Sequence, residues 1–162
     1  MNLKPERVFH YFRELSDIPR ESHNEKAVSD YIYNFGKKLG LETKQDDILN
    51  VYMRKPATKG YENKPGIILQ GHMDMVCEKA TSSKHNFATD KIEWVIKDDL
   101  LFANNTALGA DDGIAVAMAM AILEDETLIH PELEVLITVT EETTMAGALG
   151  LEKGLLKGKY FF

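Results

Sequence analysis

Residues 67–70, Ile-Ile-Leu-Gln, begin with three consecutive apolar side chains, which is typical of a strand covered on both faces. A longer run, residues 133–140 (LEVLITVT), is the strongest strand signal in the chain. Helical periodicity is present in residues 5–18 and 22–40. Residues 112–124 are rich in Ala and Met and apolar on most faces, which predicts a helix packed in the interior. Strands that alternate with helices predict an α/β sandwich, with a largely parallel, mixed sheet between the helices.

Shorter patterns predict a strand at residues 48–54 and a hairpin at residues 92–102. Residues 146–156 are expected to form a helix with glycine interruptions, and residues 159–162 the beginning of a last strand. Ser22-His-Asn-Glu25 has the form of a capping box that opens the second helix. The chain has 162 residues and contains no repeat or internal boundary, so we expect a single domain.

The composition is that of a globular protein, with 44% hydrophobic and 28% charged residues. The net charge of −7 and the lack of a Lys/Arg cluster argue against a nucleic-acid partner. No apolar stretch reaches the roughly 20 residues that span a bilayer, and the first residues do not resemble a signal peptide. The single cysteine, Cys77, cannot form an internal disulfide. We therefore expect a cytoplasmic protein without a membrane partner.

Polar residues collect where the apolar elements begin or end, and ligands of open α/β sheets bind at such places. His72 and Asp74 follow the first apolar run. Residues two apart on an extended chain face the same side, so the Asp74 carboxylate can reach the imidazole of His72 and fix its tautomer, as at metal-bound histidines. Taken alone, a solvated strand end explains this pair at least as well.

Two acidic pairs occupy similar positions. Asp111 and Asp112 stand at the head of the Ala/Met-rich helix and are flanked by Gly109 and Gly113. Two adjacent aspartates between glycines exceed what a helix cap needs, but an aspartate cap explains this pair equally well. Glu141 and Glu142 directly follow LEVLITVT. Because adjacent residues at a strand end point in different directions, one glutamate can bind a metal while the other faces a substrate water. A solvated turn is the ordinary alternative for this pair.

A histidine, an aspartate and a glutamate at equivalent edges of one sheet form a ligand set that suits Zn²⁺ or Mn²⁺. The sequence contains no Walker-type phosphate loop and no G-x-S-x-G motif. Cys77 has no evident partner that would make it a nucleophile. The residues therefore favour metal-dependent chemistry.

Three segments, GHMDMV, LGADDGIAVA and TVTEETTMAGALGL, resemble the co-catalytic zinc peptidases of the carboxypeptidase/aminoacylase type. Within that group, the stretch RKPATKGYENKPGIILQGHMDMVCEK is most similar to the aminoacyl-histidine (Xaa-His) dipeptidases, which cleave dipeptides such as carnosine. The resemblance extends from about residue 19 to the end of the sequence, and the order and spacing of the motifs agree with it.

The resemblance implies a role for each candidate residue. His72 is implied to bind one metal ion, Asp111 to bridge two ions and Glu142 to bind the other. Asp74 is implied to hold the His72 ring, and Glu141 to be the general base that takes a proton from a water bridging the ions. The implied cofactors are two divalent ions, with zinc expected and manganese or cobalt as alternatives. A cis peptide bond after Asp111 is also implied.

The resemblance further implies an N-terminal part of a catalytic domain. Relatives supply another metal-binding aspartate just after the strand that begins at residues 159–162, and a final histidine after a separate dimerisation domain. The sequence stops before both, so we expect residues 1–162 alone to be inactive. The dimerisation domain of the relatives implies that the parent enzyme is a homodimer. Thr143 and Thr144 stand where relatives usually carry a small residue or glycine, so the shape of this loop can differ.

Three functions remain open at this point. The first is metal-dependent hydrolysis of Xaa-His dipeptides. The second is a tripeptidase or an aminoacylase-type amidohydrolase, since the metal motifs alone do not separate these enzymes. The third, for this chain taken alone, is a non-catalytic fragment.

Overall fold

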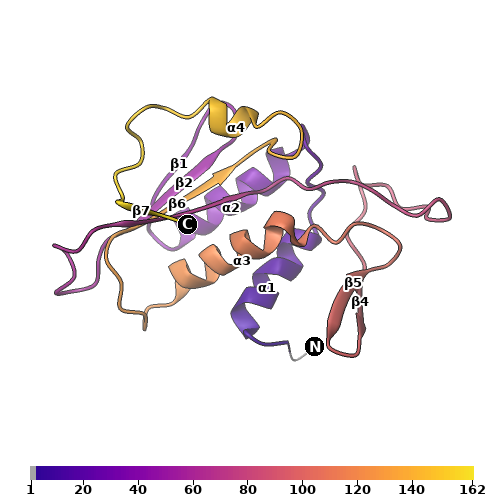
Figure 1. The fold of residues 1–162 in the computed structure, drawn as a ribbon, viewed down its shortest axis with the longest axis horizontal. Coiled ribbons are helices and arrows are strands. Elements are labelled where there is room, and N and C mark those ends of the chain that lie inside the picture. The colour runs from indigo at the N-terminus through magenta and orange to yellow at the C-terminus, as the bar shows by residue number, and fades with distance from the viewer. Residues whose placement is uncertain (1–2) are drawn as a thin grey trace.

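The computed structural model describes residues 3–162 (Figure 1). Its elements are, in chain order, α1 (Glu6–Ser16), α2 (Lys26–Lys38), β1 (Glu42–Gln45), β2 (Val51–Lys55), β3 (Ile67–His72), β4 (Trp94–Lys97), β5 (Leu100–Ala103), α3 (Ala110–Glu124), β6 (Leu133–Thr138), α4 (Ala146–Leu149) and β7 (Tyr160–Phe161). Within these residues, no helix has the length and apolar character needed to cross a membrane.

Five strands form one mixed sheet in the order β1-β2-β6-β3-β7. β3 runs parallel to both β6 and β7, whereas β1 with β2 and β2 with β6 are antiparallel. The two apolar runs are the neighbouring strands β3 and β6, and every residue of β6 is buried. The predicted α/β fold with a mixed sheet and packed helices is thus confirmed, although only two of the four strand pairings are parallel, so the sheet is not largely parallel.

The core lies where α1, α2 and α3 pack together and against the sheet (Figure 1). α3 contacts both α1 and β3, and α2 lies over β1 and β2. The side chains that fill this core are almost completely inaccessible to solvent; they include Phe12, Leu15, Ile32, Met53, Met120 and Val135. This packing fixes the beginning of α3 next to the end of β3.

Several element boundaries differ from the sequence prediction. The strand β1 was not predicted, because its sequence Glu-Thr-Lys-Gln is polar and lies at the sheet edge. The predicted helix 146–156 is wrong beyond Leu149. Gly154 has a φ of +80°, and the following irregular segment is held by the buried Glu134 carboxylate, which accepts the backbone N–H groups of Lys157 and Gly158. The hairpin in 92–102 is confirmed as β4 and β5, which form a separate two-stranded sheet.

The predicted capping box at Ser22–Glu25 is also wrong. α2 begins at Lys26 and has no side-chain cap. The Ser22 hydroxyl instead donates to Asp74, and the Glu25 carboxylate accepts from Thr140. Both side chains therefore support the polar residues at the ends of β3 and β6.

Candidate metal centre

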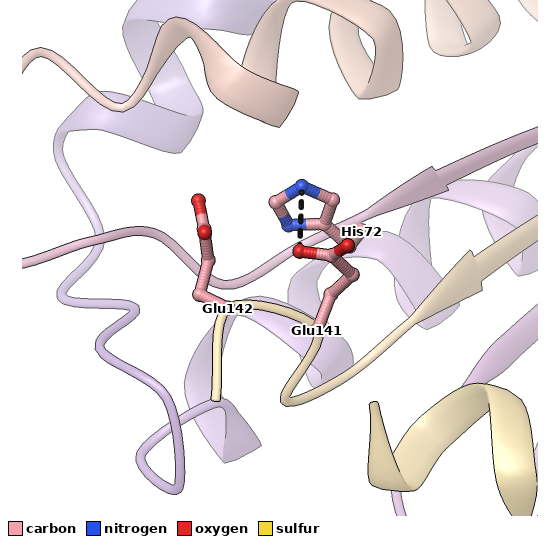
Figure 2. Close-up of side chains that lie close together, drawn as sticks. All are labelled: His72, Glu141 and Glu142. Atoms are coloured by element: carbon pink, nitrogen blue, oxygen red, sulfur yellow. Dashed lines mark ion pairs between the residues drawn. The ribbon is translucent and has the colours of Figure 1, made fainter. Parts of the chain in front are cut away.

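The candidate site lies where the parallel strands β3 and β6 end side by side. His72, the last residue of β3, is in register with Thr138, the last residue of β6. Glu141 and Glu142 lie in the turn after β6, and their carboxylates approach the His72 ring (Figure 2). α3 begins beside these two strand ends and brings Asp111 to the same ring.

One nitrogen of the His72 ring faces a group of carboxylates. Nε2 lies 3.2 Å from Oδ1 of Asp111 and 3.6 Å from Oε2 of Glu141. His72, Glu141 and Glu142 each offer a ligand atom within 4.8 Å of the other two. The Asp111 side chain is 87% exposed, so its carboxylate extends from the protein surface toward the ring.

The other ring nitrogen, Nδ1, faces Asp74. It lies 3.4 Å from Oδ1 of the Asp74 carboxylate and 3.2 Å from the Asp74 backbone oxygen. Burial lowers the pKa of His72, but the hydrogen bond and charge of Asp74 and the charges of Asp112 and Glu141 outweigh burial and raise it to about 9. This contact orients the ring so that Nε2 points to the carboxylates.

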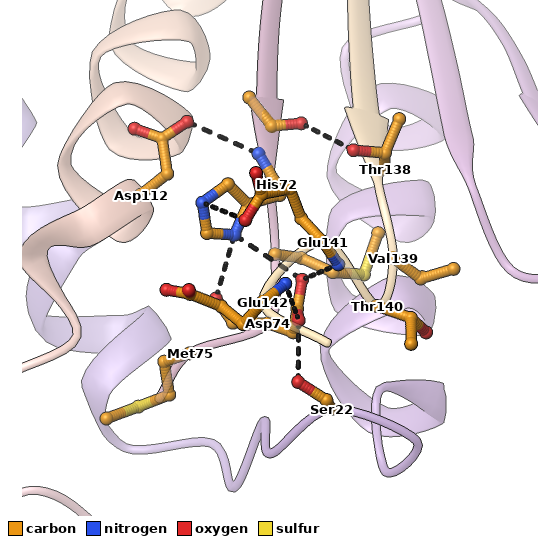
Figure 3. Close-up of polar contacts among 12 residues, drawn as sticks. Ser22, His72, Asp74, Met75, Asp112, Thr138, Val139, Thr140, Glu141 and Glu142 are labelled. Carbon is orange, nitrogen blue, oxygen red and sulfur yellow. Dashed lines mark hydrogen bonds and ion pairs between the residues drawn. The ribbon is translucent and has the colours of Figure 1, made fainter. Parts of the chain in front are cut away.

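The Asp74 carboxylate is completely buried and holds three further donors (Figure 3). It accepts the Ser22 hydroxyl at 2.7 Å and the backbone N–H groups of Glu141 and Glu142 at 3.0 and 3.1 Å. Burial raises the pKa of Asp74, but these bonds and the one to His72 lower it to about 2. One carboxylate thus fixes both the His72 ring and the backbone of the glutamate pair.

Asp112 points away from the carboxylate group and toward β3. Its Oδ2 accepts the backbone N–H of His72 at 3.3 Å (Figure 3). A Cβ at Gly71 would lie 2.7 Å from this oxygen, so the close approach requires glycine there. The side chain is half-buried, and burial raises its pKa. The peptide bond between Asp111 and Asp112 is cis, as the sequence resemblance implied.

Glu25 supports the turn that carries the glutamates. Its buried carboxylate accepts both the backbone N–H and the hydroxyl of Thr140, each at 2.9 Å. Thr140 has a φ of +57° and directly precedes Glu141. Sequence reasoning missed this role, and that of Ser22, because their spacing also fits a helix cap.

The structure brings together all five residues predicted from the sequence. The role of each as metal ligand, bridging ligand, positioning residue or base stays a prediction. The donor set fits a divalent cation, because imidazole and carboxylates are the ligands that zinc takes in catalytic sites. Ligand atoms around a tetrahedral zinc at about 2.0–2.2 Å lie about 3.3–3.6 Å apart. The distances from Nε2 of His72 to Asp111 and Glu141 are close to this range.

Comparisons with known proteins find peptidases that resemble this chain in sequence and fold. The chain is 40% identical over 155 residues to the cytosol non-specific dipeptidase of Escherichia coli, with 96% of this chain and 32% of the relative covered. The crystal structure of aminoacylhistidine dipeptidase from Vibrio alginolyticus superimposes with a TM-score of 0.95 at 39% identity, covering 99% of this chain and 33% of that one. A tripeptidase from Staphylococcus aureus matches with a TM-score of 0.79 at 25% identity, over 98% of this chain and 43% of that one.

No protein-family model matches the chain. The chain spans about a third of the length of the two dipeptidases. By both sequence and fold, it is a homologue of these peptidases over that part of their length.

Proposed function

We propose that the protein is a metal-dependent peptidase that hydrolyses dipeptides. The observation that carries this proposal is the His72 ring, whose Nε2 faces carboxylates from α3 and from the turn after β6. These groups lie on a fold that superimposes on a dipeptidase with a TM-score of 0.95. Imidazole and carboxylate ligands that converge at the ends of two parallel strands suit metal-assisted hydrolysis.

In this proposal, two divalent ions are held by His72, Asp111 and Glu142, and zinc is the expected metal. When bound, such ions act as Lewis acids and make a water molecule acidic near neutral pH. Asp74 keeps the His72 ring in place and offsets positive charge at the site. Glu141 takes a proton from the attacking water and delivers it to the nitrogen of the leaving amine. The products are a carboxylate and a free amine.

The substrate range is proposed from the relatives. One is named a non-specific dipeptidase and the other an aminoacylhistidine dipeptidase. We therefore propose dipeptides as the substrate class, with Xaa-His dipeptides among them. A cytosolic location and a homodimeric assembly belong to the same proposal, the first supported by the name of the Escherichia coli relative.

The test uses the protein expressed from its natural reading frame, treated with EDTA and then given Zn²⁺, Mn²⁺ or Co²⁺. β-Alanyl-histidine, alanyl-alanine, trialanine and an N-acetylated amino acid are offered as substrates. His72→Ala is the site variant, and His130→Ala is its control, since His130 is equally buried but interacts with Pro131 and Thr58.

We expect dipeptide hydrolysis that EDTA removes and a metal ion restores. His72→Ala should abolish it and His130→Ala should retain it. Faster cleavage of trialanine or of the acetylated amino acid would instead favour a tripeptidase or an aminoacylase. Hydrolysis that survives EDTA or the loss of His72 would refute the proposal.

A further inference from the structure

Arg20 lies in the segment between α1 and α2, and only 2% of its surface is exposed. Its Nη1 donates to the backbone oxygens of Met73 and Asp74, at 3.0 and 3.2 Å. Its Nη2 donates to the backbone oxygen of Gly109 at 2.5 Å. A single guanidinium thus joins the segment after β3 to the segment before α3.

Each of these two segments carries one part of the candidate site. Met73 and Asp74 directly follow His72. Gly109 lies two residues before Asp111, whose largely exposed side chain contacts Nε2 of the His72 ring at 3.2 Å. Arg20 therefore joins the backbone next to His72 to the backbone next to Asp111.

The two glycines on either side of the aspartate pair make room for this guanidinium. A Cβ at Gly109 would collide with Nη2, and Gly109 also has a φ of +69°. A Cβ at Gly113 would lie 2.7 Å from the same nitrogen. The glycine pattern around Asp111 and Asp112, which helix capping does not require, is explained by the approach of Arg20.

This arrangement is costly for the folded state. All three acceptors are neutral carbonyl groups, and Nε has no acceptor among the described residues. Burial lowers the pKa of Arg20 to about 10, although Cys77, Asp74 and Asp112 act in the opposite direction. An apolar side chain at such a position often stabilises a fold as well as a buried charge does. Stability alone therefore gives a weak reason for an arginine here.

We infer that Arg20 is a positioning residue that clamps the two ligand-bearing segments together and so brings His72 and Asp111 to one metal site. This inference rests on the proposed metal-dependent function. Arg20 itself lies behind the site and contacts backbone atoms, so it acts through the residues it holds.

The test compares Arg20→Met, which keeps an unbranched apolar stem but is shorter and has no donor, with Arg20→Lys, which keeps the charge but not the fork of donors. Leu15→Ala serves as a control for lost stability, because Leu15 is buried in α1. Arg54→Met controls for the loss of an arginine elsewhere, since Arg54 pairs with Glu42 and Glu132 at the far side of the sheet.

Three properties are measured on the protein from its natural reading frame: zinc affinity by competition with a chelator, kcat and KM for a dipeptide, and amide hydrogen exchange of residues 72–75 and 109–112. We expect Arg20→Met to weaken zinc binding and to lower kcat by about 10–100-fold, the usual effect of losing a group that orients metal ligands. KM should change little, Arg20→Lys should be intermediate, and exchange should accelerate in both segments.

The inference is overturned if Arg20→Met keeps wild-type zinc affinity and exchange, or if Leu15→Ala with the same loss of Tm weakens zinc binding equally. If Arg20→Met does not fold, Arg20→Lys decides by the same criteria. If the wild-type protein neither binds zinc nor cleaves peptides, the proposed function fails. The exchange data then decide alone: faster exchange in both segments supports the clamp, and unchanged exchange refutes it.

Discussion

Asp74→Asn removes one negative charge from a completely buried side chain and hardly changes its size. The carboxylate accepts the Ser22 hydroxyl and the backbone N–H groups of Glu141 and Glu142, and it faces the His72 ring. Asparagine offers one acceptor oxygen and presents an amide NH₂ group in place of the other. At least one of the two backbone N–H groups then faces a donor.

The structure sets the size of the effect. The pKa of Asp74 is lowered from 3.8 to about 2, and each pKa unit corresponds to about 1.4 kcal/mol. The contacts of the ionised form therefore stabilise the folded state by about 2 kcal/mol. Leaving one buried N–H without an acceptor costs about 1–3 kcal/mol by a separate route. Both figures describe the same contacts, so we expect a loss of about 2 kcal/mol.

The assay is urea unfolding of the EDTA-treated protein at pH 5–6, a range between the unfolded-state pKa of an aspartate and that of a histidine. Asp125→Asn is the matched control, because Asp125 accepts two bonds from Thr127 on the exposed surface. The wild-type advantage over Asp74→Asn should shrink as the pH falls through about 2, where the folded-state carboxyl takes up a proton. Equal stability of Asp74→Asn and the wild type at pH 5–6 would refute the reasoning.

Three further predictions concern the same site. Glu141→Gln should lower kcat by about 10²–10⁴-fold and keep the bound metal. Glu142→Gln should instead lose part of the bound metal. If metal analysis shows the loss in Glu141→Gln, the roles of the two glutamates are reversed. Glu25→Ala should lower the free energy of unfolding by about 1–3 kcal/mol, because it leaves both donors of Thr140 without an acceptor. Glu25→Gln keeps an acceptor oxygen and should lower it less. Equal losses in the two variants would contradict this. The folded-state pKa of His72 is raised from 6.5 to about 9, so its contribution to stability is present below pH 6.5 and lost as the pH rises through about 9. The Tm of the EDTA-treated protein should therefore fall as the pH rises over that range. A fall of the same size in Asp74→Asn would show that the contact with Asp74 does not cause it.

The position of the site could be predicted from the sequence because it depends on strand geometry. The run before His72 and the run before Glu141 are both apolar enough to be recognised as buried strands. Parallel neighbouring strands end at the same edge of a sheet, so the polar residues that follow them must meet there. The expected role of each residue, as metal ligand or as base, came from the resemblance of the three motifs to known peptidases, because strand geometry alone does not give it.

The supporting residues could not be predicted in the same way. Ser22 and Glu25 have the spacing of a capping box, and only the tertiary fold shows that their partners are Asp74 and Thr140. Arg20 bonds to backbone oxygens, which every residue carries, so no sequence pattern identifies its partners.

Two elements were misjudged for local reasons. The edge strand β1 has no apolar face that would mark it as a strand. The segment after Leu149 keeps apolar residues at helical spacing, but α4 ends at Leu149, and the positive φ of Gly154 is incompatible with a regular helix through 156.

Anomalous X-ray diffraction at the zinc absorption edge, from crystals of the protein soaked in Zn²⁺, shows whether the ends of β3 and β6 form a metal site. We expect zinc peaks within bonding distance, about 2.0–2.2 Å, of Nε2 of His72 and of carboxylate oxygens from Asp111 and Glu142. The Nδ1 side of the ring should remain occupied by Asp74. Zinc peaks elsewhere, with no density at His72 under saturating zinc, would contradict the assignment of this strand end as a metal site.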